Sequence, residues 1–141
     1  MLRRGVISES VELVVPFHDV DAMQIVWHGN YTKYLELARF ALMEKLGYGY
    51  DVMRVNGVKW PIVDLQIRYA QPATVGQRLT VAATLVEWEN QMVIDYEITD
   101  TTTGARLTRA SSTQVAVSVE TGELRLLSPE LLLDLVQKVL T

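Results

Sequence analysis

The sequence of 141 residues contains no cysteine and only two histidines. Without cysteine the chain can form no disulfide, no thiolate metal site and no cysteine nucleophile. Two histidines alone fall short of the ligand set of a zinc site, so we expect neither a metal nor another cofactor. No stretch approaches 18 apolar residues in a row, about the minimum for a membrane-spanning helix. We therefore expect no membrane span.

Basic clusters are also missing, and the formal net charge is -4. Nucleic acid is therefore a poor candidate partner, because phosphate binding needs clustered Lys and Arg. The segment MLRRGVISESVE has two arginines but lacks the apolar run of a signal peptide, so we expect a cytoplasmic protein. Apolar residues make up 49% of the chain. At this length they support a core without cross-links, and we expect one domain over residues 1–141.

The hydrophobic period changes along the chain and predicts the secondary structure. Alternating apolar residues at 11–15 predict a short strand that ends at Pro16. A wide apolar stripe over 30–46 predicts a helix embraced by a sheet, with Asn30 as N-cap and Gly47 as its C-terminal stop. The residues of this stripe are Tyr31, Tyr34, Leu35, Leu37, Ala38, Ala41, Leu42 and Leu46.

After Gly57 the period becomes two, which predicts strands over 63–69, 79–85, 92–98 and 107–119. Glu89-Asn90 is short enough for a hairpin link, and 101–104 predicts the next turn. Ser128-Pro129 predicts a short terminal helix with Ser128 as cap and Pro129 in the first helical position. The order of elements indicates an α+β class. We expect about five antiparallel strands around one long helix, plus a short C-terminal helix.

The stretch HDVDAMQIVWHGNY, residues 18–31, places polar groups directly ahead of the predicted long helix. It contains both histidines and two aspartates. Such residues can cap the helix, or they can form an active site that uses the free N–H groups and the positive dipole end of the helix. The residue types alone leave both interpretations open.

The longer stretch PFHDVDAMQIVWHGNYTKYLELAR resembles the signature of the 4-hydroxybenzoyl-CoA thioesterase family of hotdog-fold proteins. That signature reads approximately D-x-D-x-x-G-x-V-x-[HY]-x-x-Y and continues into a helix with an E-x-x-R-like turn. IRYAQPATVGQRLTV is similar to the strand-turn-strand of the same family. Gln24 departs from the pattern, which usually has Gly there, and we expect it to narrow the thioester site or add a polar contact. The matching residues are Asp19, Asp21, Val26, His28, Tyr31, Glu36 and Arg39.

The resemblance implies the hotdog fold and the hydrolysis of an acyl-CoA or aroyl-CoA thioester. It makes Asp21 the catalytic carboxylate, either as nucleophile or as general base. The backbone N–H near His28 becomes an oxyanion donor beside the accessible backbone of Gly29, and the His28 side chain becomes a second catalytic candidate. The candidate substrate contacts are Gly29, Trp27, Met23, Tyr31 and, from a partner subunit, Asp64.

Other interpretations remain beside this one. Asp19 is expected to be structural, holding the loop through backbone N–H groups, and Glu36 is expected to form an ion pair with Arg39. A hotdog dehydratase could instead use His28 and Glu36, and a non-catalytic acyl-thioester binder would not need Asp21. An acyl carrier protein could replace coenzyme A, although no basic patch for it is apparent.

The resemblance also implies a homodimer with a continuous sheet, or a homotetramer, with active sites between protomers. Coenzyme A carries phosphates, which arginine binds well. The candidate phosphate contacts, chosen by charge alone, are Arg68, Arg78, Arg106 and Arg109.

Overall fold

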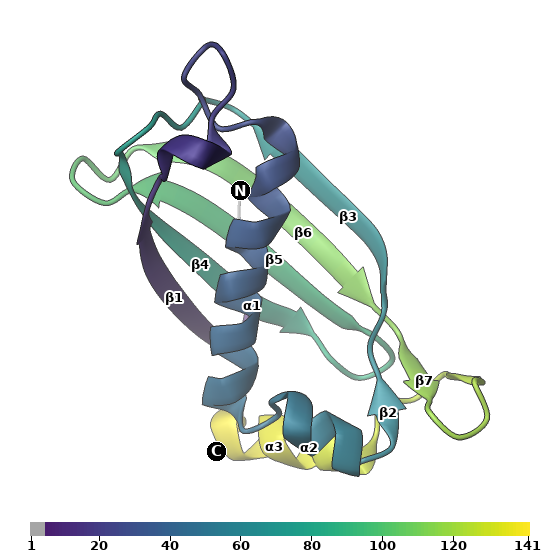
Figure 1. Ribbon diagram of the computed structural model, residues 1–141. Coiled ribbons are helices and arrows are strands. Elements are labelled where there is room, and N and C mark those ends of the chain that lie inside the picture. The colour runs from purple at the N-terminus through teal and green to yellow at the C-terminus, as the bar shows by residue number, and fades with distance from the viewer. Residues whose placement is uncertain (1–4) are drawn as a thin grey trace.

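The computed structural model describes residues 5–141, so the N-terminal Arg3 and Arg4 lie outside the described residues. The chain begins with a strand, enters two 3-10 turns and a long helix, and then forms the remaining strands (Figure 1). The elements are β1 (Ile7–Val14), η1 (Phe17–Asp19), η2 (His28–Asn30), α1 (Tyr31–Leu46), α2 (Tyr50–Val55), β2 (Val58–Lys59), β3 (Ile62–Tyr69), β4 (Arg78–Glu87), β5 (Met92–Asp100), β6 (Arg106–Gln114), β7 (Ala116–Ser118), β8 (Leu124–Arg125) and α3 (Glu130–Leu140).

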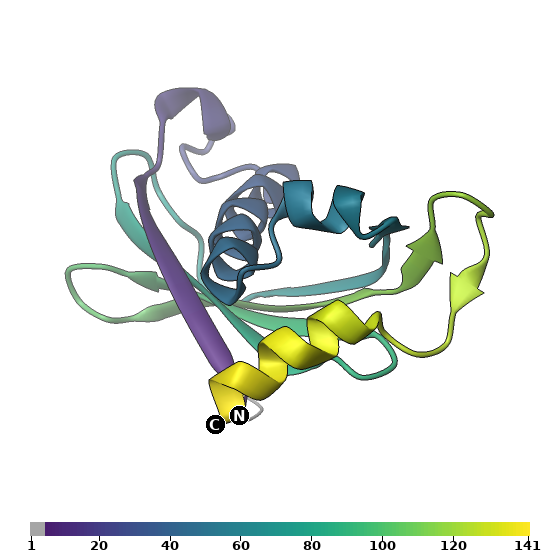
Figure 2. The ribbon, with the colours of Figure 1, turned by 90° about the horizontal axis from the view of Figure 1, so that it is seen from below.

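Five strands form one antiparallel sheet in the order β1-β4-β5-β6-β3. Figure 1 shows α1 lying across the concave face of this sheet, and Figure 2 shows the same helix nearly end-on inside the curve. The short strands β2, β7 and β8 form a second sheet at one end. The predicted α+β class, with about five antiparallel strands around one long helix and a short C-terminal helix, is confirmed.

The core lies between α1 and the strands behind it. Leu79, Val81, Ala83 and Leu85 alternate along β4 and are fully buried. They face the buried side of α1, where Leu42 is also fully buried. Each large aliphatic side chain buried in this way contributes about 1.5–3 kcal/mol. This packing fixes the orientation of α1, and therefore the position of its N-terminal end.

Some details of the predicted helix were wrong. Leu37 was placed in the buried stripe but is 52% exposed, while Arg39 and Met43 are buried. The guanidinium of Arg39 forms hydrogen bonds with Glu36 on α1 and Tyr50 on α2. A polar residue can therefore be buried on this face of the helix. Asn30 is the N-cap residue of α1 as predicted, but its side chain donates to the Asp19 carbonyl at 2.8 Å and makes no capping hydrogen bond. Gly47 does end the helix, with a φ of 87°.

The predicted strand over 107–119 is two strands, β6 and β7. Between them Val115 donates its N–H to the Pro61 carbonyl at 3.2 Å, outside the main sheet. The predicted cap at Ser128 is also wrong: α3 begins at Glu130 with Pro129 as its N-cap, because the Ser128 hydroxyl donates to the Trp88 carbonyl. The hairpin link at 89–90 and the turn at 101–104 are confirmed.

The edge strand β3 differs from the other strands of the main sheet in its exposure. Only Ile67 along its eight residues is partly buried, and the others are exposed on both faces. Among the exposed ones are Ile62, Val63, Leu65 and Tyr69. Within residues 5–141 no helix is both long and apolar enough to cross a membrane.

Candidate active site

The loop that carries Asp21 folds back on itself in a tight turn. The Asp21 N–H donates to the Ile25 carbonyl at 2.9 Å, and the Gln24 N–H donates to the Asp21 carbonyl at 2.9 Å. An isolated bridge between Val20 and Val26 closes the base of the turn, and a second joins Ile25 to Thr74 in the segment before β4. Oδ1 of Asp21 accepts the Met23 N–H at 2.8 Å. Within residues 5–141 Oδ2 has no hydrogen-bond partner, so the carboxylate is held in place with one oxygen available.

Gln24 occupies the left-handed backbone region, with a φ of 64°. The turn imposes this conformation, and glycine adopts it without the cost of a Cβ, about 1–2 kcal/mol. The structure thus gives a backbone reason for the glycine that the family pattern has at this position. The Gln24 side chain is exposed.

We expect the two substitutions Gln24→Gly and Gln24→Val to separate backbone strain from side-chain contacts. Gly relieves strain but loses more chain entropy on folding, so its free energy of unfolding should equal or exceed that of the wild type by up to about 1 kcal/mol. Val has a branched Cβ, and Gln24→Val should lower the free energy of unfolding by about 1–2 kcal/mol relative to the wild type. Urea unfolding measures both; equal stability of the Gly and Val variants would contradict the strain.

Asp19 joins the loop to α1 from a buried position, with only 4% exposure. Its carboxylate accepts hydrogen bonds from Lys33 Nζ and from the Tyr34 hydroxyl, each at 2.7 Å. Its carbonyl accepts the Trp27 N–H at 3.0 Å. Burial acts to raise the pKa of the Asp19 carboxyl, but these donors and the charge of Lys33 outweigh burial and lower it. Asp19 is structural as expected, although its side chain binds other side chains and not backbone N–H groups, and its own N–H and carbonyl make the contacts with the backbone.

The amides at the start of α1 form the second part of the site. Asn30 donates its N–H to the Trp27 carbonyl at 2.8 Å. Within the described residues the N–H groups of His28 and Gly29 have no acceptor. They lie at the N-terminal end of η2 and α1, where the helix dipole is positive. This end of the helix can therefore bind a carbonyl oxygen that gains negative charge.

Trp27 lies over Gly29 and is 51% exposed. A Cβ built on Gly29 would overlap the six-membered ring of Trp27, so any larger residue would require this half-exposed indole to move. The imidazole of His28 is exposed and lies 5.1 Å, ring to ring, from Trp27. Met23 is 72% exposed in the adjoining turn. The loop thus presents two large exposed apolar side chains, and that of Trp27 lies against Gly29.

Tyr69, which the sequence analysis did not single out, connects the end of β3 to this site. Its hydroxyl donates to the His28 carbonyl at 3.1 Å, and its ring packs edge-on against Tyr31 at 4.9 Å. Tyr31 itself is only 2% exposed and its hydroxyl accepts the Ala73 N–H at 3.3 Å. The structure therefore places Tyr31 in the core behind the helix start, and the predicted contact of Tyr31 with substrate stays a prediction.

Asp64 lies on β3, five residues before Tyr69, which corresponds to about 17 Å along the strand. Its side chain is exposed and accepts a hydrogen bond from Gln66 Nε2 at 3.4 Å. Within one protomer the structure does not bring Asp64 to the Asp21 loop. Its predicted role depends on a second subunit.

Glu36 and Arg39 form the predicted ion pair on α1. Arg39 Nε donates to Glu36 Oε1 at 2.8 Å, and Nη2 donates to Glu36 Oε2 and, at 3.1 Å, to the Tyr50 hydroxyl. Partial burial acts to raise the pKa of Glu36, but the hydrogen bonds and charge of Arg39 lower it. Glu36 is thus an ionised partner of Arg39. The role of Tyr50 was not predicted, because its helix α2 has only six residues and is too short for a periodic pattern.

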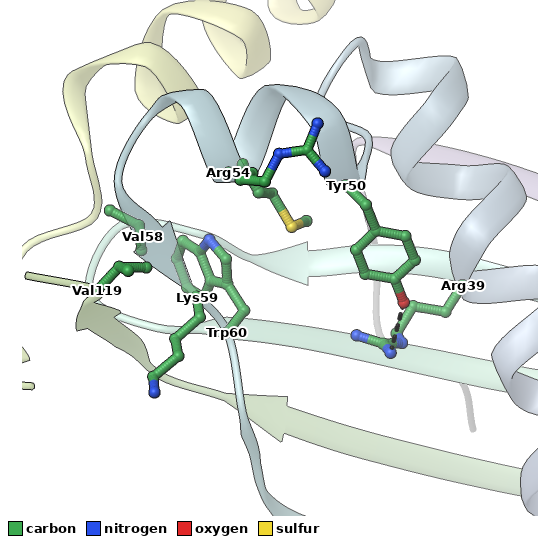
Figure 3. A pocket seen from close by; sticks show the side chains of 8 residues that line it. Arg39, Tyr50, Arg54, Val58, Lys59, Trp60 and Val119 are labelled. Atoms are coloured by element: carbon green, nitrogen blue, oxygen red, sulfur yellow. Dashed lines mark hydrogen bonds between the residues drawn. The ribbon is translucent and has the colours of Figure 1, made fainter.

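A cavity of about 260 Å³ opens beside Arg39, away from the helix start (Figure 3). Sequence reasoning did not anticipate this cavity, because residues from α1, α2, β2 and the segments that follow β2 and β7 meet there only after folding. Among residues 5–141 no group of three or more His, Asp or Glu side chains is arranged to hold a metal ion. The lining residues are Arg39, Tyr50, Met53, Arg54, Val58, Lys59, Trp60 and Val119.

Comparison with known proteins agrees with this architecture. Residues 15–135 match the family described as the Thioesterase-like superfamily. The chain belongs to this superfamily. The resemblance to hotdog thioesterases found in the sequence is thereby confirmed, and the Asp21 turn and helix start both lie inside the matched thioesterase-like region.

Two relatives illustrate the range of this thioesterase-like superfamily. The Bacillus subtilis (strain 168) protein named "Putative acyl-CoA thioesterase YneP" is 32% identical over 110 residues, covering 77% of this chain and 79% of that protein. The DHNA-CoA thioesterase of Staphylococcus aureus has 26% identity and a TM-score of 0.76, covering 84% of this chain and 80% of that one.

A solved complex shares the fold at lower identity. It is a mutant of 4-hydroxybenzoyl CoA thioesterase bound to 4-hydroxybenzoyl CoA, with 23% identity and a TM-score of 0.79. The alignment covers 92% of this chain and 98% of that one. The hotdog arrangement of sheet and helix therefore extends over nearly the whole chain.

Proposed function

We propose that this protein is an acyl-CoA thioesterase, which hydrolyses an acyl-CoA or aroyl-CoA to the free acid and coenzyme A. The observation that carries the proposal is the Asp21 carboxylate, held in a turn with one oxygen unbonded, on the loop that leads directly to the unpaired amides of His28 and Gly29. Membership of the thioesterase-like superfamily supports the same reaction.

The two parts of the site have complementary roles in this reaction. The free amides and the helix dipole stabilise the negative charge that develops on the thioester oxygen, and one such donor is worth roughly 3–4 kcal/mol in the transition state. Asp21 either attacks the carbonyl carbon, giving a mixed anhydride that water then cleaves, or orients the attacking water. In both routes the C–S bond breaks, the thiolate of coenzyme A leaves and takes up a proton, and water supplies the second carboxylate oxygen. His28 orients the thioester or the water.

The hotdog dehydratase is the weaker alternative. It would use Glu36 as an acid, but Glu36 is bound by two nitrogens of Arg39 and has a lowered pKa, which favours the ionised form. A proton donor needs the opposite shift. The third alternative, a binding protein without activity, gives no role to the unbonded oxygen of Asp21.

A panel of short, long and aromatic acyl-CoAs tests the proposed function through release of the thiol. Thioesterase activity predicts free thiol and free acid in equal amounts. Hydration of an enoyl thioester without thiol release would establish the dehydratase instead. Tight binding without turnover of any thioester would establish the binding protein.

The edge strand β3 supports a homodimer with a continuous sheet. An exposed edge presents unpaired N–H and C=O groups, and proteins normally cover such an edge. Here it also carries the exposed apolar side chains of Ile62, Val63 and Leu65. We propose that two copies pair through β3 about a two-fold axis, which makes the contact the same on both sides. Further assembly into a tetramer and a cytoplasmic location remain predictions.

The dimer also gives the partner's strand a place beside the Asp21 loop, including the partner's Asp64. Of the four candidate arginines, the two that are neighbours on adjacent strands, Arg68 and Arg109, are the best placed to bind one phosphate of coenzyme A together. Arg78 is paired with Glu12 and Arg106 with Glu97, whereas Arg68 and Arg109 lie directly opposite each other on β3 and β6. Two adjacent cations near the end of β3 suit a phosphate group.

We expect light scattering to give a mass of at least twice the 15.9 kDa of the chain. A charge in the middle of the paired edge, Leu65→Lys, should shift the protein toward monomer and lower kcat/KM at the same time. The matched control is Val14→Lys at the end of the opposite edge strand β1, where 57% of the valine is exposed. A wild-type protein that is fully active as a monomer would refute an active site formed between two protomers.

A further inference from the structure

The cavity beside Arg39 has a charge pattern unlike that of the rest of the chain. The whole sequence has 17 acidic residues and 13 Lys and Arg. The cavity is lined by three of these cations, Arg39, Arg54 and Lys59, and by no acid. Arg39 and Arg54 are each paired with an acid outside the lining, Glu36 and Asp51, so an anionic ligand would be bound through donor positions that these pairs leave open and not through net charge.

Arg39 is the deepest of the three cations, with 8% exposure. Its Nε and Nη2 are held by Glu36 and Tyr50, as described above. Within the described residues its Nη1 has no acceptor. Figure 3 shows the Arg39 head group extending from α1 toward the side of the cavity where Trp60 lies. The guanidinium is thus fixed in orientation and keeps one nitrogen free, a preorganised donor to an oxygen anion.

The other two cations have different surroundings. Arg54 pairs with Asp51 at 2.9 Å, but both side chains are largely exposed, so this pair is weak and Arg54 can turn to a ligand. Figure 3 places Arg54 above Tyr50, whereas the ammonium of Lys59 points away from Arg54 and Tyr50. Lys59 therefore lines the cavity mainly with its aliphatic stem.

The remaining walls of the cavity are apolar or aromatic. Met53, Val58 and Trp60 are buried beneath its surface, and Val119 closes one side. The volume of about 260 Å³ exceeds the roughly 150 Å³ of a protein cavity that accepts benzene. The cavity can therefore hold a short chain or a single ring together with a charged end.

The position of the cavity relates it to the partner's Asp21 in the proposed dimer. Tyr69, at the end of β3, touches His28 and Tyr31 at the start of α1, so α1 and β3 run in opposite directions. The cavity lies at the other end, where β2 leads into β3. Two-fold antiparallel pairing through β3 brings the end of one strand beside the beginning of its partner. The Asp21 turn of one protomer and the cavity of its partner then lie at the same end of the paired strands.

We propose that this cavity receives the far end of the acyl group whose thioester is cleaved at Asp21 of the other protomer, and that it selects acyl groups ending in a carboxylate. This inference rests on the proposed function and names its substrate class. Arg39 Nη1 and the Arg54 guanidinium bind the terminal carboxylate, while Met53 and Trp60 contact the carbon chain. Arg39 and Arg54 are the residues that determine specificity.

The test compares acyl-CoAs of equal chain length with and without a terminal carboxylate, such as adipoyl-CoA against hexanoyl-CoA and glutaryl-CoA against pentanoyl-CoA. We expect kcat/KM to favour the diacid by at least about 10-fold, equivalent to about 1.4 kcal/mol from charge-assisted hydrogen bonds. Arg54→Gln should remove most of this preference by lowering kcat/KM for adipoyl-CoA more than kcat/KM for hexanoyl-CoA. Arg39→Lys, which keeps the charge but loses the planar donor, should reduce the preference as well.

The control is Arg78→Gln, which removes a cation on β4 that is paired with Glu12 and does not line the cavity. It should keep the wild-type preference. Two results would overturn the carboxylate selectivity while leaving the proposed thioesterase function in place. One is equal or better hydrolysis of the acyl-CoAs without a terminal carboxylate, and the other is a higher kcat/KM for 4-hydroxybenzoyl-CoA than for the diacid thioesters. Absence of thiol release from every substrate would instead refute the proposed function itself.

Discussion

Replacing Asp21 with asparagine is expected to lower kcat at least ~100-fold, which corresponds to about 2.7 kcal/mol of barrier. Asparagine keeps a side-chain oxygen that can accept the Met23 N–H, so the turn should survive. It loses the negative charge that attacks the carbonyl or orients water. The rate of thiol release under saturating acyl-CoA measures the effect.

Two controls accompany the Asp21→Asn variant. Its urea midpoint should match that of the wild type, which separates chemistry from folding. Asp134→Asn, at an exposed position on α3, should leave kcat unchanged. An Asp21→Asn enzyme that turns over within a few-fold of the wild type would remove Asp21 from the mechanism.

The second large effect concerns stability. Asp19→Ala should lower the free energy of unfolding by roughly 2–3 kcal/mol, because it leaves the buried Tyr34 hydroxyl without its charged acceptor. The Lys33 contact adds little, since more than half of that side chain is exposed. Urea unfolding at pH 7 measures the loss. Glu12→Ala, which removes an exposed pair with Arg78, is the matched control and should cost less than about 1 kcal/mol.

The contribution of Asp19 should also depend on pH. Its pKa is lowered in the folded state, so the unfolded chain binds the proton first as the pH falls. The stabilisation is complete above the unfolded pKa, about 3.9, and is lost as the pH falls through the lower folded value. The difference between wild type and Asp19→Ala should therefore shrink in acid. A difference that grows as the pH falls would contradict the account of Asp19 as a carboxylate that its hydrogen bonds keep ionised in the folded state.

Much of the fold could be predicted because the periodic signals are local. The alternation along 79–85 and 92–98 and the apolar stripe of the long helix each reflect burial against one neighbouring layer. The break at Val115 and the cap at Pro129 could not be predicted in this way. They depend on the Pro61 and Trp88 carbonyls, which are distant in sequence.

In the candidate site, too, the local features could be predicted from the sequence and the long-range contacts could not. The motif located the Asp21 turn and the helix start, and the positive φ of Gln24 explains why the family pattern has glycine at this position. The sequence could not reveal that Arg39 is buried or that Tyr50 holds it, because a charged residue on a helix surface normally faces solvent. It also could not reveal Tyr69, whose hydrogen bond to His28 spans 41 positions in the chain.

The most direct test of the central claim is a crystal structure of the Asp21→Asn variant with an intact acyl-CoA that the wild type hydrolyses. The account predicts the thioester oxygen about 3 Å from the amide nitrogen of His28 or Gly29. It also predicts the carbonyl carbon about 3.5 Å from the side chain of residue 21 or from a water bound to it. A thioester bound away from both the helix start and residue 21 would contradict the account.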